Sequence, residues 1–430
     1  MSVASGPAAE PPAESRGVPA RRWLSSALVR QSALYTSTNL AISVMGAVAS
    51  ALLARHFDTS EFGAYSFAMA FLGFSAGFFE FGLFMPVARL SSAEQAEGQS
   101  EIAGAAFLTF VPVGLSFSLL ILLLSFEVDG LFRVHASSIL RIAALLAFAY
   151  AFGQLAQWLA VGAGRLHLYS LATFGAQVLF VVLVLVNLLV SWPLSPAGAV
   201  TLQLAAMGLG WLAFALWLRP TFRNLRLRLD QLLAGAREYG VQVYIGRILS
   251  IGTYNMDVLM LGALFMPSAV GFYVLAGAIA GASGMPAMAF ATALFRNLAN
   301  RPLIERRWLL VSVGLAIAST VVAWLLAGPF VRIVFTERYA PVAALVVPLA
   351  AAAGVRGVTS LYNSFLSAHG LGKELRNAGI ALTVSNLILN FALIPPFGAT
   401  GAAWASLLAL VVNLVAHLAG YRRYQRGLPA

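Results

Sequence analysis

The sequence contains no cysteine, and this absence excludes several kinds of chemistry. Disulfide bonds, a thiolate nucleophile and cysteine-based metal sites all require that residue. The five histidines are scattered along the chain, mostly near loops, without the spacing of metal ligands. We therefore expect no bound metal and no cofactor.

Charged residues are also scarce. They make up 10% of the 430 residues, whereas hydrophobic residues make up 60%. A soluble domain of this size carries about 25% charged residues. The apolar runs are long and unbroken, unlike the alternating ten-residue segments of a membrane β-barrel. The composition therefore predicts an all-α polytopic membrane protein.

The signatures of common enzyme classes are missing as well. The sequence has no GxxxxGK[ST] phosphate loop, so we do not expect it to hydrolyse ATP. HExxH and GxSxG are absent, and the pair Gly208 and Gly210 lacks the third glycine of a dinucleotide-binding loop. These absences favour a transporter over an enzyme.

Apolar runs of about 20 residues or more mark the membrane-spanning helices. We predict twelve spans, at residues 31–54, 62–88, 102–126, 137–162, 168–190, 197–218, 239–264, 269–295, 308–334, 341–367, 376–394 and 398–420. They group into an N-terminal six-helix lobe (30–218) and a C-terminal six-helix lobe (239–420). The remaining segments are a disordered tail (1–29), a basic linker (219–238) and a basic C-terminal tail (421–430).

The basic residues indicate the orientation of these spans. With both termini in the cytoplasm, 20 of the 27 Lys and Arg fall in cytoplasmic segments. The outer segments then hold Arg55, Arg133, Arg141, Arg332 and Arg338. The net charge of +11 thus follows topology, and no nucleic-acid partner is expected. The basic linker either contacts anionic lipid head groups or simply joins the lobes.

The two halves contain a weak internal repeat. Residues 57–65 (FDTSEFGAY) and 265–273 (FMPSAVGFY) match at the pairs Phe57/Phe265, Ser60/Ser268, Gly63/Gly271 and Tyr65/Tyr273. Asn187 and Asn390, and Pro196 and Pro396, follow in the same order. Because each repeat has an even number of spans, the lobes should be related by a pseudo-two-fold axis along the membrane normal. This plan is typical of secondary transporters with a substrate path between the halves.

Polar residues form stripes on several predicted helices. A charge at bilayer depth costs at least about 2.5 kcal/mol, so Arg247 and Asp257 in the seventh span indicate a functional site. The stripes contain Thr36, Asn39 and Ser43; Arg247, Tyr254 and Asp257; Arg356, Ser360 and Asn363; and Asn386 and Asn390. Such residues also join helices by hydrogen bonds. Two stripes contain an arginine, which favours a shared polar cavity.

Two acidic residues are candidates for ion coupling. Asp257 either binds a coupling ion or neutralises Arg247 or Arg356. Glu80, late in the second span, is a proton or cation site or a partner of Arg89 near the membrane interface.

Several stretches resemble one transporter family. Residues 52–83 (LLARHFDTSEFGAYSFAMAFLGFSAGFFEFGL) are similar to the N-terminal region of Wzx-type oligosaccharide flippases, in the multidrug/oligosaccharidyl-lipid/polysaccharide exporter superfamily. Residues 254–273, 337–350 and 386–409 resemble later helices of that family, with Asp257 at its acidic position. The chain departs from the family pattern at Glu80, where Asp is expected.

This resemblance implies transport of an undecaprenyl-diphosphate-linked oligosaccharide across the cytoplasmic membrane for cell-surface polysaccharide synthesis, by ion-coupled alternating access. Arg247 and Arg356 would bind the diphosphate, and the polar stripes would contact the sugars. Expected partners are the lipid-linked oligosaccharide, membrane lipids, a polysaccharide polymerase and glycosyltransferases.

Three alternatives remain at this stage. A multidrug/cation antiporter of the same superfamily would need an acidic cavity, whereas Arg247 and Arg356 outnumber Asp257. A membrane glycosyltransferase, polymerase or ligase usually has a sizeable outer loop, which the predicted topology lacks. The third alternative is a non-transporting scaffold of a polysaccharide assembly complex.

Overall fold

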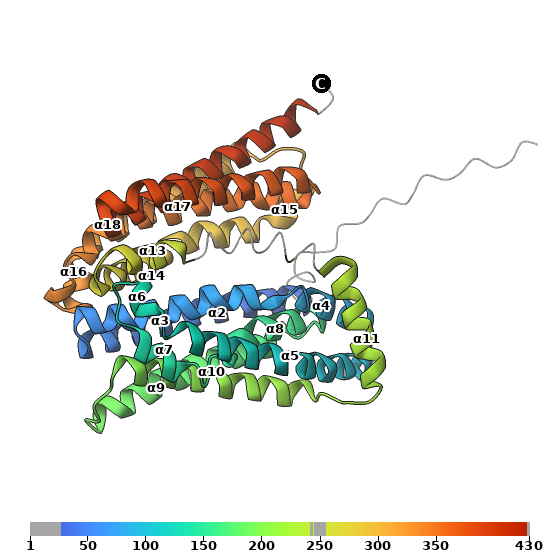
Figure 1. Ribbon diagram of the computed structural model, residues 1–430. Helices are drawn as coiled ribbons and strands as arrows, with labels where there is room; N and C mark the ends of the chain where they lie inside the picture. The colour runs from blue at the N-terminus through green and yellow to red at the C-terminus, as the bar shows by residue number, and fades with distance from the viewer. Residues whose placement is uncertain (1–26, 241–243, 245–254, 428–430) are drawn as a thin grey trace, which may run out of the picture.

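The structure is a computed structural model that describes residues 27–240, 244 and 255–427, and these residues fold into helices and short connections (Figure 1). The first helices are α2 (Ala27–His56), α3 (Thr59–Gly77), α4 (Phe84–Ala93), α5 (Ala96–Leu124), α6 (Val128–Leu131), α7 (Ser137–Ala143), α8 (Phe148–Gly162), α9 (Leu166–Leu189) and α10 (Pro196–Leu218). They are followed by α11 (Leu225–Gly235), α13 (Met256–Leu264), α14 (Pro267–Ala293), α15 (Phe295–Ala299), α16 (Arg306–Phe335), α17 (Val342–Ala368) and α18 (Gly372–Arg426).

Most of the predicted spans have a counterpart among these helices. Nine described helices are long and apolar enough to cross a membrane, and the pair α7–α8, bent by 57°, is a tenth candidate. The seventh predicted span, 239–264, lies largely outside the described residues, which include its last part as α13. Each other predicted span corresponds to at least one described helix.

Helix α18 contains both the eleventh and the twelfth predicted spans. Its 55 residues would extend for about 80 Å, which far exceeds the bilayer core of about 30 Å. The helix breaks at Gly398, where φ is +56°, two residues after Pro396, which itself follows Pro395. A left-handed φ suits glycine, and the prolines remove backbone donors, so the chain bends here. The two spans therefore meet at a sharp bend in place of a loop.

The helices form two groups that are clearly separated in the ribbon view (Figure 1). Helices α2 to α10 make the N-terminal lobe, and α13 to α18 make the C-terminal lobe. We call the end of the molecule where α2 finishes the His56 end, and the opposite end, which carries α11, the Arg228 end. The lobes lie close together at the His56 end, and α18 leans away from the N-terminal lobe at the Arg228 end.

The lobes touch through the repeat-related helices α3 and α14. A Cβ atom on Gly63 would stand 1.9 Å from the backbone oxygen of Pro267, and one on Gly271 would stand 3.2 Å from the backbone nitrogen of Gly63. Only residues without a side chain permit backbones to approach this closely. The two glycines paired by the sequence repeat thus meet at the contact between the lobes.

The repeat-related tyrosines also make equivalent contacts. The Tyr65 hydroxyl on α3 donates to Gln203 Oε1 on α10 at 2.5 Å. The Tyr273 hydroxyl on α14 lies 3.1 Å from Ser406 Oγ on α18. Each tyrosine therefore links the second span of its lobe to the last span of the same lobe.

Further contacts hold the lobes together at the His56 end. Arg55 Nε donates to the backbone oxygen of Val334 at 2.8 Å, and the Arg133 backbone N–H donates to that of Gly262 at 2.8 Å. The rings of Phe62 and Tyr339 meet edge to face at 6.0 Å. These contacts close the His56 end.

The predicted basic linker contains helix α11, which is attached to the N-terminal lobe. Arg228 Nε donates to Glu101 Oε2 at 2.9 Å, and Arg228 Nη1 donates to Glu94 Oε1 at 2.6 Å. Burial disfavours the charge on this guanidinium, but the hydrogen bonds to the two carboxylates outweigh it, so the pKa of Arg228 is raised. Asn224 also donates to Glu101, at 2.9 Å. The linker is therefore anchored to one lobe.

Candidate functional site

A cavity of about 560 Å³ lies between the two lobes. The N-terminal lobe contributes residues of α2, α3, α9 and α10, among them Ser43, Tyr65 and Gln203. The C-terminal lobe contributes α14 and the guanidinium-bearing Arg356 of α17. We call this the central cavity. Its walls come from both repeats, as expected for a path between the halves of a secondary transporter.

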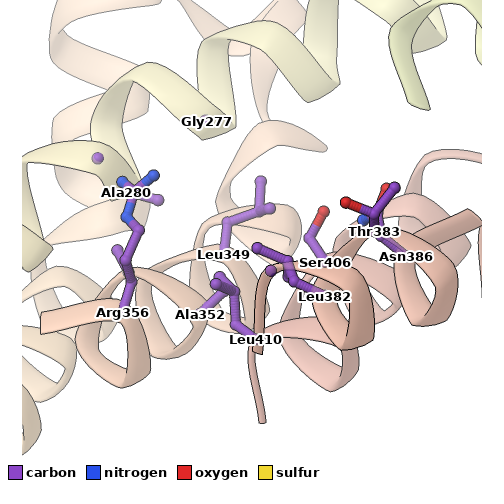
Figure 2. A pocket seen from close by; sticks show the side chains of 13 residues that line it. Gly277, Ala280, Leu349, Ala352, Arg356, Leu382, Thr383, Asn386, Ser406 and Leu410 are labelled. Atoms are coloured by element: carbon purple, nitrogen blue, oxygen red, sulfur yellow. The ribbon is translucent and has the colours of Figure 1, made fainter. Parts of the chain in front are cut away.

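A second cavity of about 470 Å³ lies within the C-terminal lobe, between α14, α17 and α18 (Figure 2). Its polar lining consists of Arg356, Thr383, Asn386 and Ser406. We call it the C-lobe cavity. Gly277, Gly281 and Arg356 line both cavities, so the two spaces adjoin at this point.

Arg356 lies near the middle of α17, and its side chain extends toward α14 near Ala280 (Figure 2). The residue is exposed in the structure, although most of its neighbours on α17 are buried. Within the described part of the chain, no carboxylate forms a salt bridge with Arg356. A fixed positive charge therefore faces the cavities at membrane depth, where it attracts an anionic group.

Some predicted cavity residues lie on the cavity walls. Ser43 lines the central cavity and donates to the backbone oxygen of Asn39 at 3.0 Å. Asn386 lines the C-lobe cavity. Ser360 is not among the residues that line either cavity, and it donates to the Arg356 backbone oxygen one helical turn away, at 2.9 Å.

Two predicted cavity residues instead make hydrogen bonds to other side chains, Asn390 within α18 and Asn363 between two helices. Asn390 is completely buried, and its Nδ2 donates to Asn386 Oδ1 at 3.1 Å. The prediction that Asn390 lines the cavity is therefore wrong, because neighbouring helices cover its side chain. Asn363 Nδ2 lies 3.3 Å from His417 Nε2 and connects α17 to α18.

Other predicted residues cannot be placed. Arg247 and Tyr254 lie outside the described residues, and so does the side chain of Thr36. Their assignment to the cavity stays a prediction from helical periodicity.

Asp257 lies in the first turn of α13 and is connected to the C-lobe cavity. Its Oδ2 accepts a hydrogen bond from the Tyr273 hydroxyl, and its Oδ1 accepts one from the Val258 backbone N–H at 2.9 Å. Tyr273 in turn contacts Ser406, which lines the C-lobe cavity. Asp257 is thus connected to the cavity surface by a chain of hydrogen bonds through Tyr273 and Ser406.

Glu80 occupies a break in the second span. Helix α3 ends at Gly77, and the chain passes through Phe81 and Gly82, with φ of +45° and +69°, before α4 begins. The prediction of one continuous helix over residues 62–88 is therefore wrong. The Glu80 side chain is buried, and its Oε1 accepts a hydrogen bond from Trp158 Nε1 at 3.3 Å inside the N-terminal lobe. The structure thus places Glu80 and Asp257 in different lobes.

Sequence reasoning missed two residues of the central cavity, Gln177 on α9 and Gln203 on α10. Both are uncharged amides inside long apolar runs, so neither produces a strong charge signal. Only the structure connects Gln203 to the repeat, through its hydrogen bond with Tyr65, which the repeat pairs with Tyr273.

Known proteins show what this arrangement is similar to. The protein family described as "Polysaccharide biosynthesis protein" matches residues 28–298. No curated protein matches this sequence. Among solved structures, the lipid II flippase MurJ in an inward closed conformation has a TM-score of 0.71 and 14% identity, covering 90% of this chain and 87% of that chain.

Two structures of multidrug resistance MATE family transporters of the MOP superfamily are also similar. The inward-facing one has a TM-score of 0.70 and 16% identity, covering 89% of this chain and 94% of that chain. The outward-facing one has a TM-score of 0.56 and 17% identity, covering 93% of this chain and 94% of that chain. Because the family match extends over more than half of the sequence, the chain belongs to the polysaccharide biosynthesis protein family, with the two-lobed fold of MOP-superfamily transporters.

Proposed function

We propose that the protein is a flippase that moves an undecaprenyl-diphosphate-linked oligosaccharide from the inner to the outer leaflet of the cytoplasmic membrane. The observation that carries this proposal is Arg356, whose charge faces both cavities with no salt-bridge partner among the described carboxylates. A diphosphate supplies the missing negative charge, and arginine binds phosphate oxygens through two parallel hydrogen bonds. Membership in a polysaccharide biosynthesis family supports a lipid-linked sugar as the cargo.

The proposed orientation places the Arg228 end in the cytoplasm, together with both termini. The Lys and Arg residues are concentrated in the segments at that end, as cytoplasmic loops require. The lobes meet at the His56 end, so the described state would admit the substrate from the cytoplasmic leaflet. The polyprenyl tail would stay in the lipid while the head group enters the central cavity.

We further propose that transport is coupled to an ion gradient through Asp257. This carboxylate accepts a hydrogen bond from Tyr273 and is connected to the C-lobe cavity through Ser406. Glu80 is the second coupling candidate, and its burial beside Trp158 supports a separate site in the N-terminal lobe. A polymerase and glycosyltransferases remain the proposed partners.

A multidrug/cation antiporter is the second candidate function, and the similarity to MATE transporters favours it. The charge of the cavities argues against it. Among the described lining residues of both cavities, the side chain that carries a charge at neutral pH is Arg356, which repels a cationic drug. A glycosyltransferase or polymerase is not supported, because the loops described at the His56 end are short.

The test of the proposal is the substitution Arg356→Ala. Hydrogen bonds to charged groups contribute about 1.5–3 kcal/mol, so binding of the diphosphate should weaken by roughly 10- to 100-fold. Arg356→Lys should retain part of the activity, because it keeps the charge and loses the bidentate geometry. The measurement is surface polysaccharide in cells that depend on this chain, with protein abundance determined in parallel.

Arg422→Ala is the matched control, since Arg422 is an exposed arginine at the end of α18 that contacts neither cavity. This variant should produce normal polysaccharide. Normal polysaccharide in Arg356→Ala cells, at equal protein abundance, would contradict the proposed function.

A further inference from the structure

A third cavity, of about 200 Å³, lies inside the N-terminal lobe and takes no part in the proposed phosphate site. Its polar and aromatic lining consists of Tyr150, Thr173, Gln177, Phe180, Gln203 and Trp211, from α8, α9 and α10. We call it the N-lobe pocket. Gln177, Phe180 and Gln203 line both this pocket and the central cavity, so the two spaces adjoin.

The N-lobe pocket is polar but carries no charge on its described lining residues. Gln203 uses its Oε1 to accept from Tyr65, which leaves its amide N–H groups available. The structure records no hydrogen bond to the Gln177 side chain from any described residue. Amides donate and accept hydrogen bonds, and so do the hydroxyl groups of a neutral sugar. A cation would find no carboxylate among these residues.

An indole borders the same pocket. Trp211 is 7% exposed, and its ring stacks on Tyr169 at 5.6 Å with an interplanar angle of 23°. Its Nε1 is buried and has no hydrogen-bond partner among the described residues. Buried donors without partners are uncommon in folded proteins. The edge of an aromatic ring beside amide groups suits a ligand ring that has both C–H and hydroxyl groups.

We propose that the N-lobe pocket receives a sugar ring of the transported lipid, while Arg356 binds its diphosphate. This inference rests on the proposed function and adds a sugar subsite to it. Gln177 and Gln203 are the residues that recognise the sugar hydroxyls, because they border both the pocket and the central cavity. Arg356 borders the central cavity from the opposite lobe. One head group therefore contacts both lobes.

The experiment measures the affinity of the full-length purified protein for two probes. One probe is undecaprenyl diphosphate, and the other is the undecaprenyl-diphosphate-linked glycan fraction extracted from membranes of the cells that carry this chain. The wild-type protein should bind the glycan-linked probe at least about tenfold more tightly, as expected from one or two additional hydrogen bonds. Gln177→Ala, Gln203→Ala and Trp211→Phe should reduce this preference, because they should weaken binding of the glycan-linked probe more than binding of undecaprenyl diphosphate.

Gln99→Ala is the matched control. The Gln99 side-chain amide donates hydrogen bonds to the backbone oxygens of Ser91 and Glu94 at the Arg228 end, away from the pocket. The preference for the glycan should therefore persist in this variant. Equal affinity of the wild-type protein for both probes would overturn the sugar subsite, and so would an intact preference in both glutamine variants. Failure of undecaprenyl diphosphate to bind, or equal binding by Arg356→Ala, would instead contradict the proposed function.

Discussion

At the scale of single residues, the cavities depend on glycines, which have no side chain, as much as on polar residues. Gly277 and Gly281 are one turn apart on α14 and line both the central and the C-lobe cavity. A Cβ atom at either position would meet no atom within 4 Å. These glycines therefore leave space beside Arg356.

We predict that Gly281→Leu blocks transport without unfolding the protein. The new side chain would fill space beside Arg356, and leucine favours the helix by up to about 1 kcal/mol relative to glycine. Binding of undecaprenyl-diphosphate glycan should weaken by about tenfold or more. The measurements are ligand affinity and the thermal unfolding midpoint.

Gly314→Leu is the control for this prediction, since a Cβ there also meets no atom within 4 Å, on the exposed side of α16. It should change neither quantity. Unchanged affinity in Gly281→Leu would show that this part of the cavity does not hold the ligand.

The residue scale also shows the limit of helical periodicity. The spacing of Asn386 and Asn390 placed both on one face of a helix, and the structure agrees, because their amides are hydrogen-bonded to each other. Only Asn386 reaches the C-lobe cavity, whereas Asn390 is fully buried. Periodicity identifies a face of a helix, but the neighbouring helices decide which part of that face remains open.

At the scale of helices, the contact between α3 and α14 determines how closely the lobes approach. Gly63 lies against the backbone of Pro267, which cannot move as a flexible side chain would. We predict that Gly63→Ala forces the lobes apart at the His56 end and costs about 1–3 kcal/mol, as overpacking does. The population should shift toward a state that is closed at the Arg228 end.

Spin labels measure this shift directly, since the natural chain has no cysteine that would react with them. Cysteines replacing Ala96 in the N-terminal lobe and Lys373 in the C-terminal lobe report the separation at the Arg228 end. Gly63→Ala should shorten the label-to-label distance. Gly175→Ala should leave it unchanged, because a Cβ at Gly175 meets no atom within 4 Å. An identical distance distribution for Gly63→Ala would contradict the proposed role of this contact.

The helices also show why span prediction worked and where it did not. Burial in lipid requires long apolar helices, so composition alone located most spans. The break at Glu80 and the bend at Gly398 left a weaker signal, because a few glycines and prolines interrupt otherwise apolar runs. Likewise, Arg228 looked like one of several linker arginines, and its partners Glu94 and Glu101 became apparent only when α11 packed against α5.

At the scale of the whole molecule, ion coupling requires that Asp257 influence how the lobes move. Asp257 is on α13, and this helix packs beside α3 of the N-terminal lobe as well as α14 and α18 of its own lobe. We predict that wild-type transport in proteoliposomes depends on an imposed proton gradient and that Asp257→Asn removes this dependence. The amide keeps the size of the side chain but cannot release a proton.

Asp230→Asn is the matched control, since Asp230 is an exposed carboxylate on α11 outside both lobes. It should retain the gradient dependence. If transport by Asp257→Asn still responds to the gradient as the wild-type protein does, Asp257 does not couple the proton.

The sequence by itself determined the membrane class, most of the spans and the repeat, because all three depend on local composition and on matching residues along the chain. It also located Arg356, since one charge in an apolar helix stands out regardless of its neighbours. Only the tertiary structure decided which polar residues share a cavity, that Gly63 and Gly271 join the lobes, and that Gln177 and Gln203 connect the N-lobe pocket to the central cavity. These features arise from contacts between helices that are distant in the chain, and local periodicity contains no information about those contacts.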